Sequence, residues 1–477
     1  ESDAVIMYTT SWCNACSEAR AFLEKHGVEY VFGIPGAKID ALFDALEDTP
    51  IEVILCRHEQ NAAFMAASYG RITGRPGVVL VTSGPGVSNL ATGLLTATTE
   101  GDPIVAIGGN VPRSMRFKES HQGTDNAKLL DAATKYSVEC AVVDNMPEIV
   151  ANAFRVAKEP RQGASFISLS QDILTEPTTL KAPNALSDLM SARAAMSQIQ
   201  SMSDQINLAK MPVLLLGEEA SRPHVASAIR TLITHHAIAC VGTYQAAGAV
   251  SRDLVHLYAG RVGLFQNQPG DQLINQSDLI ITVGFNPVEY DPEIWNKDQS
   301  KTIIHIDDNR CDVHTTYMPV LECLGDIASN LELLTECLPE LKDAKQKEVV
   351  EGFRKELDQE LVNAASYAGM PIHPLRFIHD LRSCLDDEAT VVCDVGSHYM
   401  WMARHFLSYE PRHLLFSNGQ QTLGVALPWA IGAHFAGRKE PIISISGDGG
   451  FLFSAMELET AVRVGANIIH FIWRDGW

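Results

Sequence analysis

Long apolar runs and positive charge are both scarce in this sequence of 477 residues. No stretch approaches the roughly 18 uninterrupted apolar residues that suggest a membrane-spanning helix, so we expect no such helix. Lys and Arg number 37 against 58 Asp and Glu, which leaves a formal net charge of −21. This balance disfavours nucleic acid and anionic membrane surfaces as partners. An anionic ligand would therefore need a local cation or backbone N–H donors.

Cysteine is sparse as well, with ten residues scattered along the chain. Several of them lie inside apolar runs, as Cys56, Cys140, Cys240 and Cys393 do. The first residues are acidic and lack a signal-peptide pattern. These features indicate a cytoplasmic protein with reduced, buried thiols, and they disfavour a disulfide framework.

One pair of cysteines is arranged differently. Cys13 and Cys16 form a C-x-x-C motif between an expected strand at 4–10 and an expected helix that runs to Lys25. A redox dithiol has this layout, because a helix N-terminus favours a thiolate. The stretch resembles the start of glutaredoxin over about 30 residues, fewer than a thioredoxin-like domain needs. A stretch with no redox role therefore stays open, and a zinc site is disfavoured because no second Cys/His pair lies nearby.

Buried strands and helices alternate through the rest of the chain. The composition, 46% hydrophobic and 20% charged, is typical of well-cored globular proteins. We expect an α/β fold of three doubly wound parallel-sheet domains, at 1–180, 190–340 and 370–477. In the first domain we expect strands at 30–36, 51–56, 78–81 and 103–107, and helices at 39–46, 61–73 and 89–99.

Two acidic residues follow apolar strands near the end of the chain. Asp448 sits in a glycine-rich turn between an expected strand at 442–446 and an expected helix at 454–462. Asp475 follows the apolar run at 468–473, one strand–helix–strand unit later. Parallel sheets bind ligands at the carboxyl edge, and a cation can bridge carboxylates to phosphate oxygens. The alternative is that both are ordinary loop aspartates.

A third acidic residue, Glu59, lies where the expected strand at 51–56 passes into a helix. A lone acid at a helix start is often only a favourable partner of the helix dipole. Its apolar surroundings and the glycine-rich turn at 82–86 also suit a carboxyl group that exchanges a proton with a ligand nitrogen. Both interpretations stay open from the residues alone.

Two further turns follow strands in the third domain. Asp394-Val395-Gly396-Ser397-His398 could hold phosphate through its backbone and through the last two side chains, or could be a routine turn between strand and helix. The loop at 418–424 precedes an apolar helix and adds another ligand-facing segment.

Taken together, residues 25–473 resemble the catabolic, flavin-independent acetolactate synthases, which are thiamine-diphosphate enzymes. The resemblance is carried by FGIPGAKIDALFDAL at 32–46, RHEQNAAFMAASYGRITGRPGVVLVTSGPGVSNLATGLLTATTEGDP at 57–103, GTYQAAG at 242–248, GLFQNQPGD at 263–271, NPVEYDPEIWN at 286–296, QTLGVALPWAIGA at 421–433 and GDGGFLFSAMELETAV at 447–462.

The resemblance implies decarboxylating condensation of two pyruvate molecules to 2-acetolactate, with thiamine diphosphate and Mg²⁺ as cofactors. It implies that Glu59 protonates the cofactor's aminopyrimidine and that Pro35, Lys38 and Gln122 line the pyruvate pocket. Asp448 and Asp475 would bind the metal, and Leu423 would bend the cofactor. The positions implied to hold the diphosphate are Gly396, Ser397, His398, Gly449 and Gly450.

The resemblance also implies a homodimer or homotetramer whose active site lies between subunits. No FAD is expected, because Arg261 is the one basic residue in the segment at 261–271, which flavin-dependent relatives use. A related 2-oxo-acid decarboxylase or oxidase and an inactive, truncated homologue are the alternatives. Family members continue for several strands and helices beyond the second metal position, whereas this chain stops at Trp477, so we expect it to be unstable or poorly active.

Overall fold

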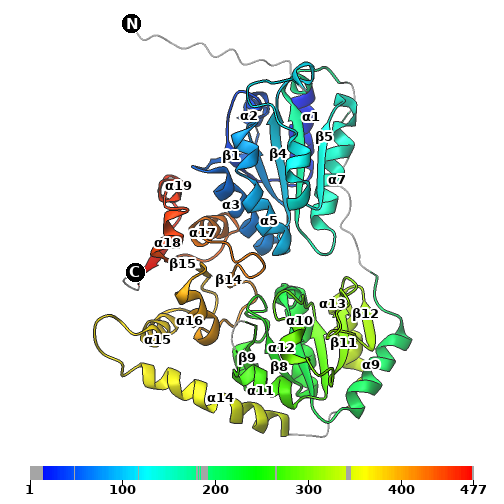
Figure 1. Ribbon diagram of the computed structural model, residues 1–477, viewed down its shortest axis with the longest axis vertical. Coiled ribbons are helices and arrows are strands. Elements are labelled where there is room, and N and C mark those ends of the chain that lie inside the picture. The colour runs from blue at the N-terminus through cyan, green and yellow to red at the C-terminus, as the bar shows by residue number, and fades with distance from the viewer. Residues whose placement is uncertain are drawn as a thin grey trace. The chain divides into compact units, whose positions relative to one another are not determined.

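The computed structural model describes residues 14–47, 49–116, 118–178, 181, 183, 192–263, 266–339 and 345–474. The chain divides into two compact units. The first unit contains residues 1–188 together with 427–437 and 454–467, and the second contains the remainder. Figure 1 shows the elements of both units. None of the described helices is long and apolar enough to span a membrane.

The first unit is built on a six-stranded sheet with the order β2-β1-β3-β4-β6-β5, and all of its pairings are parallel. The sequence predicts such a sheet because β3, β4 and β6 are buried along their whole length and read as continuous apolar runs. The strands are β1 Tyr30–Ile34, β2 Glu52–Leu55, β3 Gly77–Val81, β4 Ile104–Asn110, β5 Tyr136–Cys140 and β6 Ala164–Ser170.

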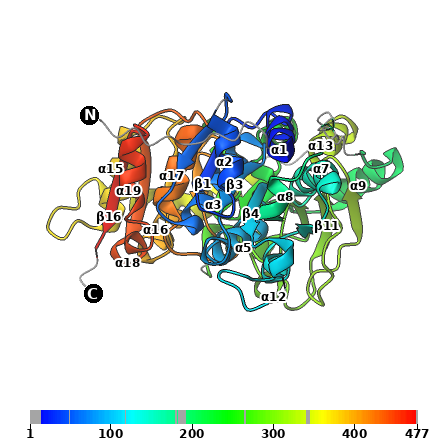
Figure 2. The ribbon, with the colours of Figure 1, turned by 90° about the horizontal axis from the view of Figure 1, so that it is seen from above.

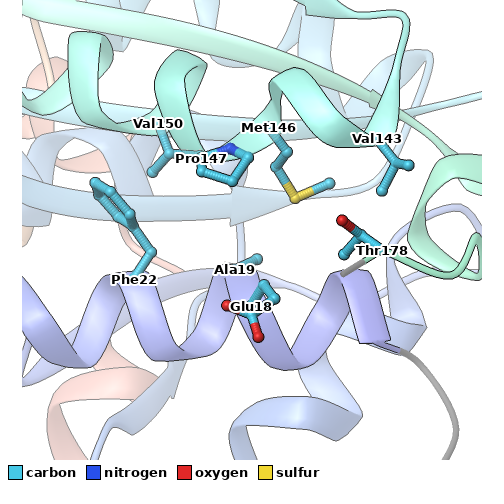
Figure 3. Close-up of a pocket in the computed structure, with 8 residues that line it drawn as sticks. All are labelled: Glu18, Ala19, Phe22, Val143, Met146, Pro147, Val150 and Thr178. Carbon is cyan, nitrogen blue, oxygen red and sulfur yellow. The ribbon is translucent and has the colours of Figure 1, made fainter. Parts of the chain in front are cut away.

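Helices cover both faces of this sheet. One apolar cluster joins the sheet to α1, α2, α7 and α8, while α3 packs on β1, β3 and β4 and α5 packs on α3 and β6. Figure 3 shows Ala19 and Phe22 of α1 facing Met146, Pro147 and Val150 of α7 around a small apolar pocket. The helices are α1 Asn14–Lys25, α2 Asp40–Glu47, α3 Glu59–Thr73, α4 Pro85–Ser88, α5 Ala91–Thr99, α6 Asn126–Leu130, α7 Met146–Lys158 and α8 Gln171–Leu174.

Two helices from the C-terminal part of the sequence also belong to the first unit. They are α17 (Ala426–Phe435) and α19 (Glu457–Arg463). Phe435 of α17 packs against Tyr30 of β1 with ring centroids 4.8 Å apart, and Figures 1 and 2 both show α17 beside β1 and α3. The sequence prediction, which assigned 370–477 to one domain, did not include helices from that range in the first unit.

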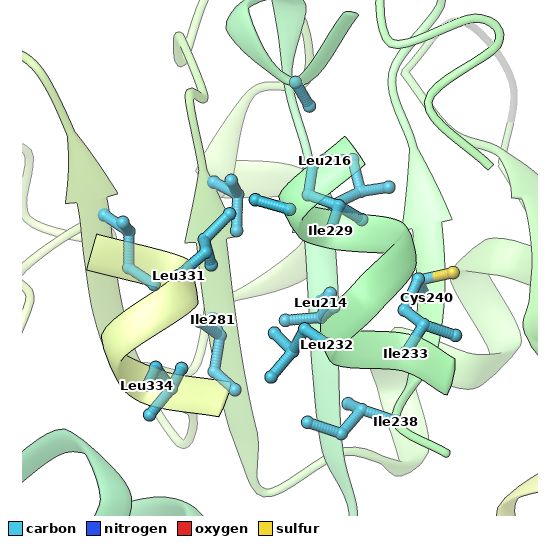
Figure 4. Close-up of a cluster of buried hydrophobic side chains, with 14 of the residues drawn as sticks. Leu214, Leu216, Ile229, Leu232, Ile233, Ile238, Cys240, Ile281, Leu331 and Leu334 are labelled. Atoms are coloured by element: carbon cyan, nitrogen blue, oxygen red, sulfur yellow. The ribbon is translucent and has the colours of Figure 1, made fainter. Parts of the chain in front are cut away.

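The second unit holds a six-stranded parallel sheet with the order β12-β11-β10-β7-β8-β9. Figure 4 shows its core, where Leu214 and Ile281 of the sheet meet Leu232 of α10 and Leu331 of α13. The elements are α9 Met196–Leu208, β7 Pro212–Leu216, α10 Pro223–His236, β8 Ala239–Gly242, β9 Tyr258–Arg261, α11 Pro269–Gln276, β10 Leu279–Val283, α12 Pro292–Trp295, β11 Thr302–Asp307, β12 Leu321–Leu324, α13 Ile327–Cys337 and α14 Lys345–Ala364.

A four-stranded parallel sheet with the order β14-β13-β15-β16 completes the second unit. Helices α15 and α16 pack on it through one apolar cluster. The fold class is therefore confirmed as three parallel α/β sheets. The elements are α15 Pro374–Cys384, β13 Val391–Cys393, α16 Ser397–His405, β14 Leu414–Phe416, β15 Ile442–Gly447, α18 Asp448–Leu452 and β16 Ile468–Trp473.

Candidate active site

Each sheet has a point where the strand order reverses, and open parallel sheets bind ligands at the carboxyl ends of the strands there. In the first unit this point lies between β1 and β3. Gly36, just after β1, passes so close to β3 that an added Cβ would lie 2.7 Å from Cβ of Thr82. Pro35 is exposed beside it. Lys38 is half-buried, and its Nζ donates to Oε1 of Gln171 at 3.1 Å.

Gln122 reaches the same edge from the segment after β4. Its backbone has a φ of 60°, a left-handed conformation that is uncommon for residues other than glycine. Its side-chain Oε1 accepts a hydrogen bond from Oγ of Ser83 at 3.1 Å. Gly84 leaves room for it, because a Cβ there would lie 3.0 Å from Cβ of Gln122. The structure thus brings Pro35, Lys38 and Gln122 to one edge of the sheet, and their role in lining a pyruvate pocket stays a prediction.

Glu59 is the first residue of α3, directly after β2 at the same edge. The helix starts here because the His58 side chain accepts a hydrogen bond from the backbone of Gln60. The half-buried carboxylate accepts a hydrogen bond from Nδ2 of Asn89 at 2.8 Å. A Cβ at Gly86 would lie 3.5 Å from its other oxygen, so the glycine keeps space beside the carboxylate. Nothing in the sequence singled out Asn89.

The reversal in the third sheet lies between β13 and β15. Asp394 follows β13 and is 0% exposed. Its carboxylate accepts hydrogen bonds from the backbone N of Val395 and of Gly424 and from Oγ of Ser446, at 2.8 to 3.2 Å. Burial nevertheless raises the pKa of Asp394 to about 6. Asp394 therefore joins the ends of both strands to the loop at 418–424, a role that the sequence did not reveal.

The turn after Asp394 leads into α16. Gly396 and Ser397 are exposed, whereas His398 is buried. Within the described residues, Nε2 of His398 has no hydrogen-bond partner, and burial lowers the pKa of this imidazole to about 4. Nδ2 of Asn418, after β14, is also buried without a partner among the described residues. Each of these atoms is available to a ligand.

Asp448 follows β15 as the first residue of α18, where it is half-buried. Its Oδ1 accepts a hydrogen bond from the backbone N of Gly449 at 2.9 Å. Space beside Gly449 is open, whereas a Cβ at Gly450 would lie 3.0 Å from the Asp394 carboxylate. Leu423 is 39% exposed in the neighbouring loop.

The predicted glycine turn after β15 needs correction, because residues 448–452 form a short helix. The next helix starts at Glu457, three residues later than predicted. Asp475, the other expected metal ligand, lies outside the described residues. Within those residues, no group of three His, Cys, Asp or Glu side chains could hold a metal ion.

These residues fit an anionic ligand held through a cation. Nε2 of His398 and Nδ2 of Asn418 are buried polar atoms that phosphate oxygens could satisfy. The Asp448 carboxylate is a hard oxygen ligand of the kind that Mg²⁺ prefers. The lack of a Cβ at Gly449 and Gly450 lets a ligand approach the backbone closely.

The central sheet reverses between β7 and β10, and a buried acid lies there. Glu289 accepts hydrogen bonds from Oγ1 of Thr243 at 2.5 Å and from the backbone N of Glu218 at 2.9 Å. Burial, reinforced by the negative charge of Glu218, raises the pKa of Glu289 well above its usual value. Arg261, the last residue of β9, is buried as well. Its guanidinium donates hydrogen bonds to the carbonyls of Ala403 and Phe406 at the end of α16.

The predicted redox dithiol, Cys13 and Cys16, stays a prediction, because its side chains lie outside the described structure. Cys13 and the expected strand at 4–10 lie outside the described residues. Cys16 falls in α1, but its side chain is also outside them. The eight described cysteines are free, and five of them are buried in or next to strands: Cys56, Cys140, Cys240, Cys323 and Cys393.

Comparisons with known proteins match all three sheets. Residues 20–131 match the N-terminal TPP binding domain of the thiamine pyrophosphate enzymes, residues 199–334 the central domain, and residues 394–477 the C-terminal TPP binding domain.

Relatives align along nearly the whole chain. It is 51% identical over 454 residues to an acetolactate synthase of Bacillus subtilis (strain 168), covering 95% of this chain and 80% of that one. Identity to a catabolic acetolactate synthase of Raoultella terrigena is 43% over 476 residues, with coverages of 97% and 83%. An acetolactate synthase isozyme 1 large subunit of Escherichia coli (strain K12) is 30% identical over 447 residues, with coverages of 92% and 78%.

Proposed function

The chain belongs to the acetolactate synthases of the thiamine pyrophosphate enzyme family, and we propose from this how its own residues serve the reaction. Acetolactate synthesis joins two pyruvate molecules with loss of CO2. The observation that carries the assignment of roles is that Glu59 and Asp448 each begin a helix at the carboxyl edge of a sheet in a thiamine-binding domain. Glu59 reaches Asn89, in the segment after β3, and Asp448 follows β15 at the strand-order reversal of its sheet.

Thiamine diphosphate, when bound, supplies a thiazolium ring that accepts the electron pair left by decarboxylation. The chain contributes the groups that hold it. His398, Asn418 and the backbone at 396–397 and 449–450 would bind the diphosphate, with Mg²⁺ held by Asp448 and Asp475. Support comes from the unpartnered Nε2 of His398, since an anion beside an imidazole favours its protonated, donating form.

Glu59 holds and returns a proton at a ring nitrogen of the cofactor's aminopyrimidine. The hydrogen bond from Asn89 fixes one carboxylate oxygen and leaves the other for this contact. Leu423, partly exposed beside Gly424, would offer an apolar side chain to the cofactor. Together these residues would orient the aminopyrimidine and govern its protonation.

Lys38, Gln122 and Pro35 bind and enclose pyruvate. The Lys38 ammonium suits a carboxylate, and Gln171 keeps that ammonium in place. Gln122 offers an amide held by Ser83. Pro35 has no backbone N–H donor, so it keeps its part of the pocket apolar. An apolar pocket favours decarboxylation, because the carboxylate charge of pyruvate is dispersed as CO2 leaves.

No FAD is needed in this assignment. In a dinucleotide-binding sheet the pyrophosphate would meet the strand-order reversal, but Glu289 places a carboxyl group there. Arg261, the one basic residue of the segment at 261–271, is committed to two backbone carbonyls. Both features disfavour an anionic dinucleotide.

The enzyme acts as a homodimer or homotetramer in the cytoplasm, with each active site completed by a second subunit. Exposed apolar side chains at the end of α18, Leu452 at 71% and the next residue Phe453 at 55%, support an assembly that covers them. Free thiols at all eight described cysteines support a reducing compartment.

The function is tested by incubating the protein with pyruvate, thiamine diphosphate and Mg²⁺ and measuring both CO2 and acetolactate. We expect acetolactate at about half the molar amount of pyruvate consumed, and aldehyde as the main product would contradict the assignment. Glu59→Gln should abolish turnover while thiamine diphosphate binding stays nearly unchanged, because the amide keeps the shape but cannot exchange the proton. Full activity in this variant would refute the proton role.

A further inference from the structure

Glu457, in α19, is a fully buried carboxylate that the proposed function leaves without a role. It is 0% exposed. Its Oε1 accepts hydrogen bonds from the backbone N of Arg57 at 3.0 Å, the backbone N of His58 at 3.1 Å and Nδ2 of Asn61 at 3.1 Å. Its Oε2 accepts the hydroxyl of Thr460 at 2.6 Å. A buried carboxylate is tolerated only with partners of this number and quality.

The donors to Glu457 surround Glu59 in the sequence. Arg57 and His58 form the connection from β2 to α3, and Asn61 lies in the first turn of α3. A carboxylate at a helix start also gains from the helix dipole. Oε1 of Glu457 therefore fixes the backbone on both sides of Glu59.

Two other side chains of α19, Glu459 and Arg463, also bind the connection from β2 to α3. The Arg57 Nε pairs with Oε2 of Glu459 at 2.5 Å, and the Arg463 guanidinium donates to the carbonyl of Leu55. The Arg57–Glu459 pair is about half exposed on both sides, so it contributes little. Among these contacts Glu457 alone is buried, and it alone binds two backbone N–H groups of the connection.

The Glu59 side chain itself has few constraints. Its described hydrogen bond comes from Asn89, so the direction of the carboxylate depends on where its backbone lies. A shift of about 1 Å in a catalytic group can cost about a hundredfold in rate.

We propose that Glu457 is a positioning residue, which sets the start of α3 so that Glu59 reaches the ring nitrogen of the cofactor. This inference rests on the proton role proposed for Glu59. If Glu457 only docked α19 onto the first unit, its loss would lower stability but leave proton exchange by bound cofactor unchanged.

The test measures hydrogen–deuterium exchange at C2 of thiamine diphosphate bound with Mg²⁺, by NMR after acid quench, at saturating cofactor and without pyruvate. Glu457→Ala removes all four hydrogen bonds, and we expect exchange about a hundredfold slower. Glu457→Gln keeps one oxygen as a weaker acceptor, so it should fall between Glu457→Ala and the unaltered protein. Glu459→Gln is the matched control, on the same helix and against the same connection, and should exchange at the unaltered rate.

Wild-type exchange rates in both Glu457 variants would overturn the proposal. If Glu457→Ala does not fold, Glu457→Gln decides it: slowed exchange supports positioning, and an unchanged rate refutes it. Glu59→Gln in the same assay separates the two claims. Normal exchange in that variant would refute the proton role of Glu59, whereas slow exchange there with normal exchange in the Glu457 variants would refute only the positioning role.

Discussion

Carboxylates at strand ends have distinct environments in this protein, although the sequence presents them alike. Asp394 is buried and accepts hydrogen bonds from three described donors, of which Gly424 N and Ser446 Oγ join its strand end to a loop and to β15. Asp448 is half-buried and accepts one described hydrogen bond, from its neighbour Gly449. A carboxylate with free lone pairs can bind a cation, whereas one with filled lone pairs holds the fold together. Asp448 is therefore the metal-binding candidate and Asp394 its structural support.

Removing the Asp448 charge should weaken cofactor binding. Asp448→Asn keeps the side-chain shape but removes a hard anionic ligand, and we expect thiamine diphosphate to bind about 10- to 100-fold more weakly in the presence of Mg²⁺. Calorimetric titration measures this affinity. Asp386→Asn, at an exposed aspartate that pairs with Lys439, serves as the control and should bind normally. Equal affinities in the two variants would contradict the metal role.

Sequence reasoning located residues whose position follows from local pattern. Glu59, Asp448 and the turn at 394–398 each come directly after an apolar strand, so their place at a sheet edge could be predicted. Asn89 and Glu457 could not, because their importance depends on a partner far away in the sequence. Glu457 bonds to residues about 400 positions earlier, and no periodicity reports such a contact.

At the level of elements, the predicted strands at 30–36, 51–56, 78–81, 103–107, 442–446 and 468–473 match observed strands to within three residues, because buried parallel strands are continuous apolar runs. No individual strand was predicted where β5, β6, β9, β12 and β14 lie. Helix ends were predicted less well. The expected helix at 454–462 is found as α19 at Glu457–Arg463, so its start lies three residues later than predicted. The glycines at 449–450 suggested a turn, since glycine disfavours helices, yet tertiary context places them in α18.

The packing of α17 on α3 depends on Gly432. A Cβ there would lie 2.0 Å from Oγ of Ser68 and 2.3 Å from the carbonyl oxygen of Met65, which is backbone and cannot turn away. Gly432→Ala should therefore lower the free energy of unfolding by about 1–3 kcal/mol, the usual cost of overpacking. Urea titration followed by fluorescence measures this.

Gly352 provides the matched comparison, because it lies inside α14 with no atom within 4 Å of an added Cβ. Gly352→Ala should raise stability by about 0.5–1 kcal/mol through helix propensity alone. If Gly432→Ala behaved in the same way, the close approach of α17 and α3 would be wrong.

For the whole molecule, the alternation of strands and helices was enough to predict three parallel sheets. It could not predict that α17 and α19 would join the first unit. Sequence order suggests that neighbouring segments fold together, whereas Gly432 and Glu457 pack on α3 across more than 350 residues of chain. Contacts between residues so far apart in the sequence place α17 and α19 in the first unit.

Three histidines with lowered pKa values, two buried and one half-buried, make stability depend on pH. Burial lowers the pKa of His398, His405 and His413 to about 4 in each case. In the unfolded chain they take up protons near pH 6.5, so the free energy of unfolding should fall as pH drops from about 6.5 to about 4, by up to about 3 kcal/mol per histidine. Asp394 acts in the opposite direction, because a carboxyl with a raised pKa loses stability as pH rises from about 4 to about 6.

Urea midpoints measured at intervals between pH 7 and pH 4 check this expectation. His405→Gln removes one of these ionisations, at a position away from the candidate site, and should make the decline shallower by up to about 3 kcal/mol over this pH range. A decline as steep as in the unaltered protein would show that His405 does not carry its share.

The split of the first unit across the sequence has a consequence for synthesis. Residues 1–188 leave the ribosome early, but the segments at 427–437 and 454–467 that complete their unit emerge only near the end. At translation rates of roughly 5–20 residues per second, the early segment waits about 15 to 55 s for its last helices. During that interval the face of α3 around Ser68 and Asn61 lacks its covering helices. We therefore expect the start of α3 to stay uncovered in the nascent chain until α19 has been synthesised.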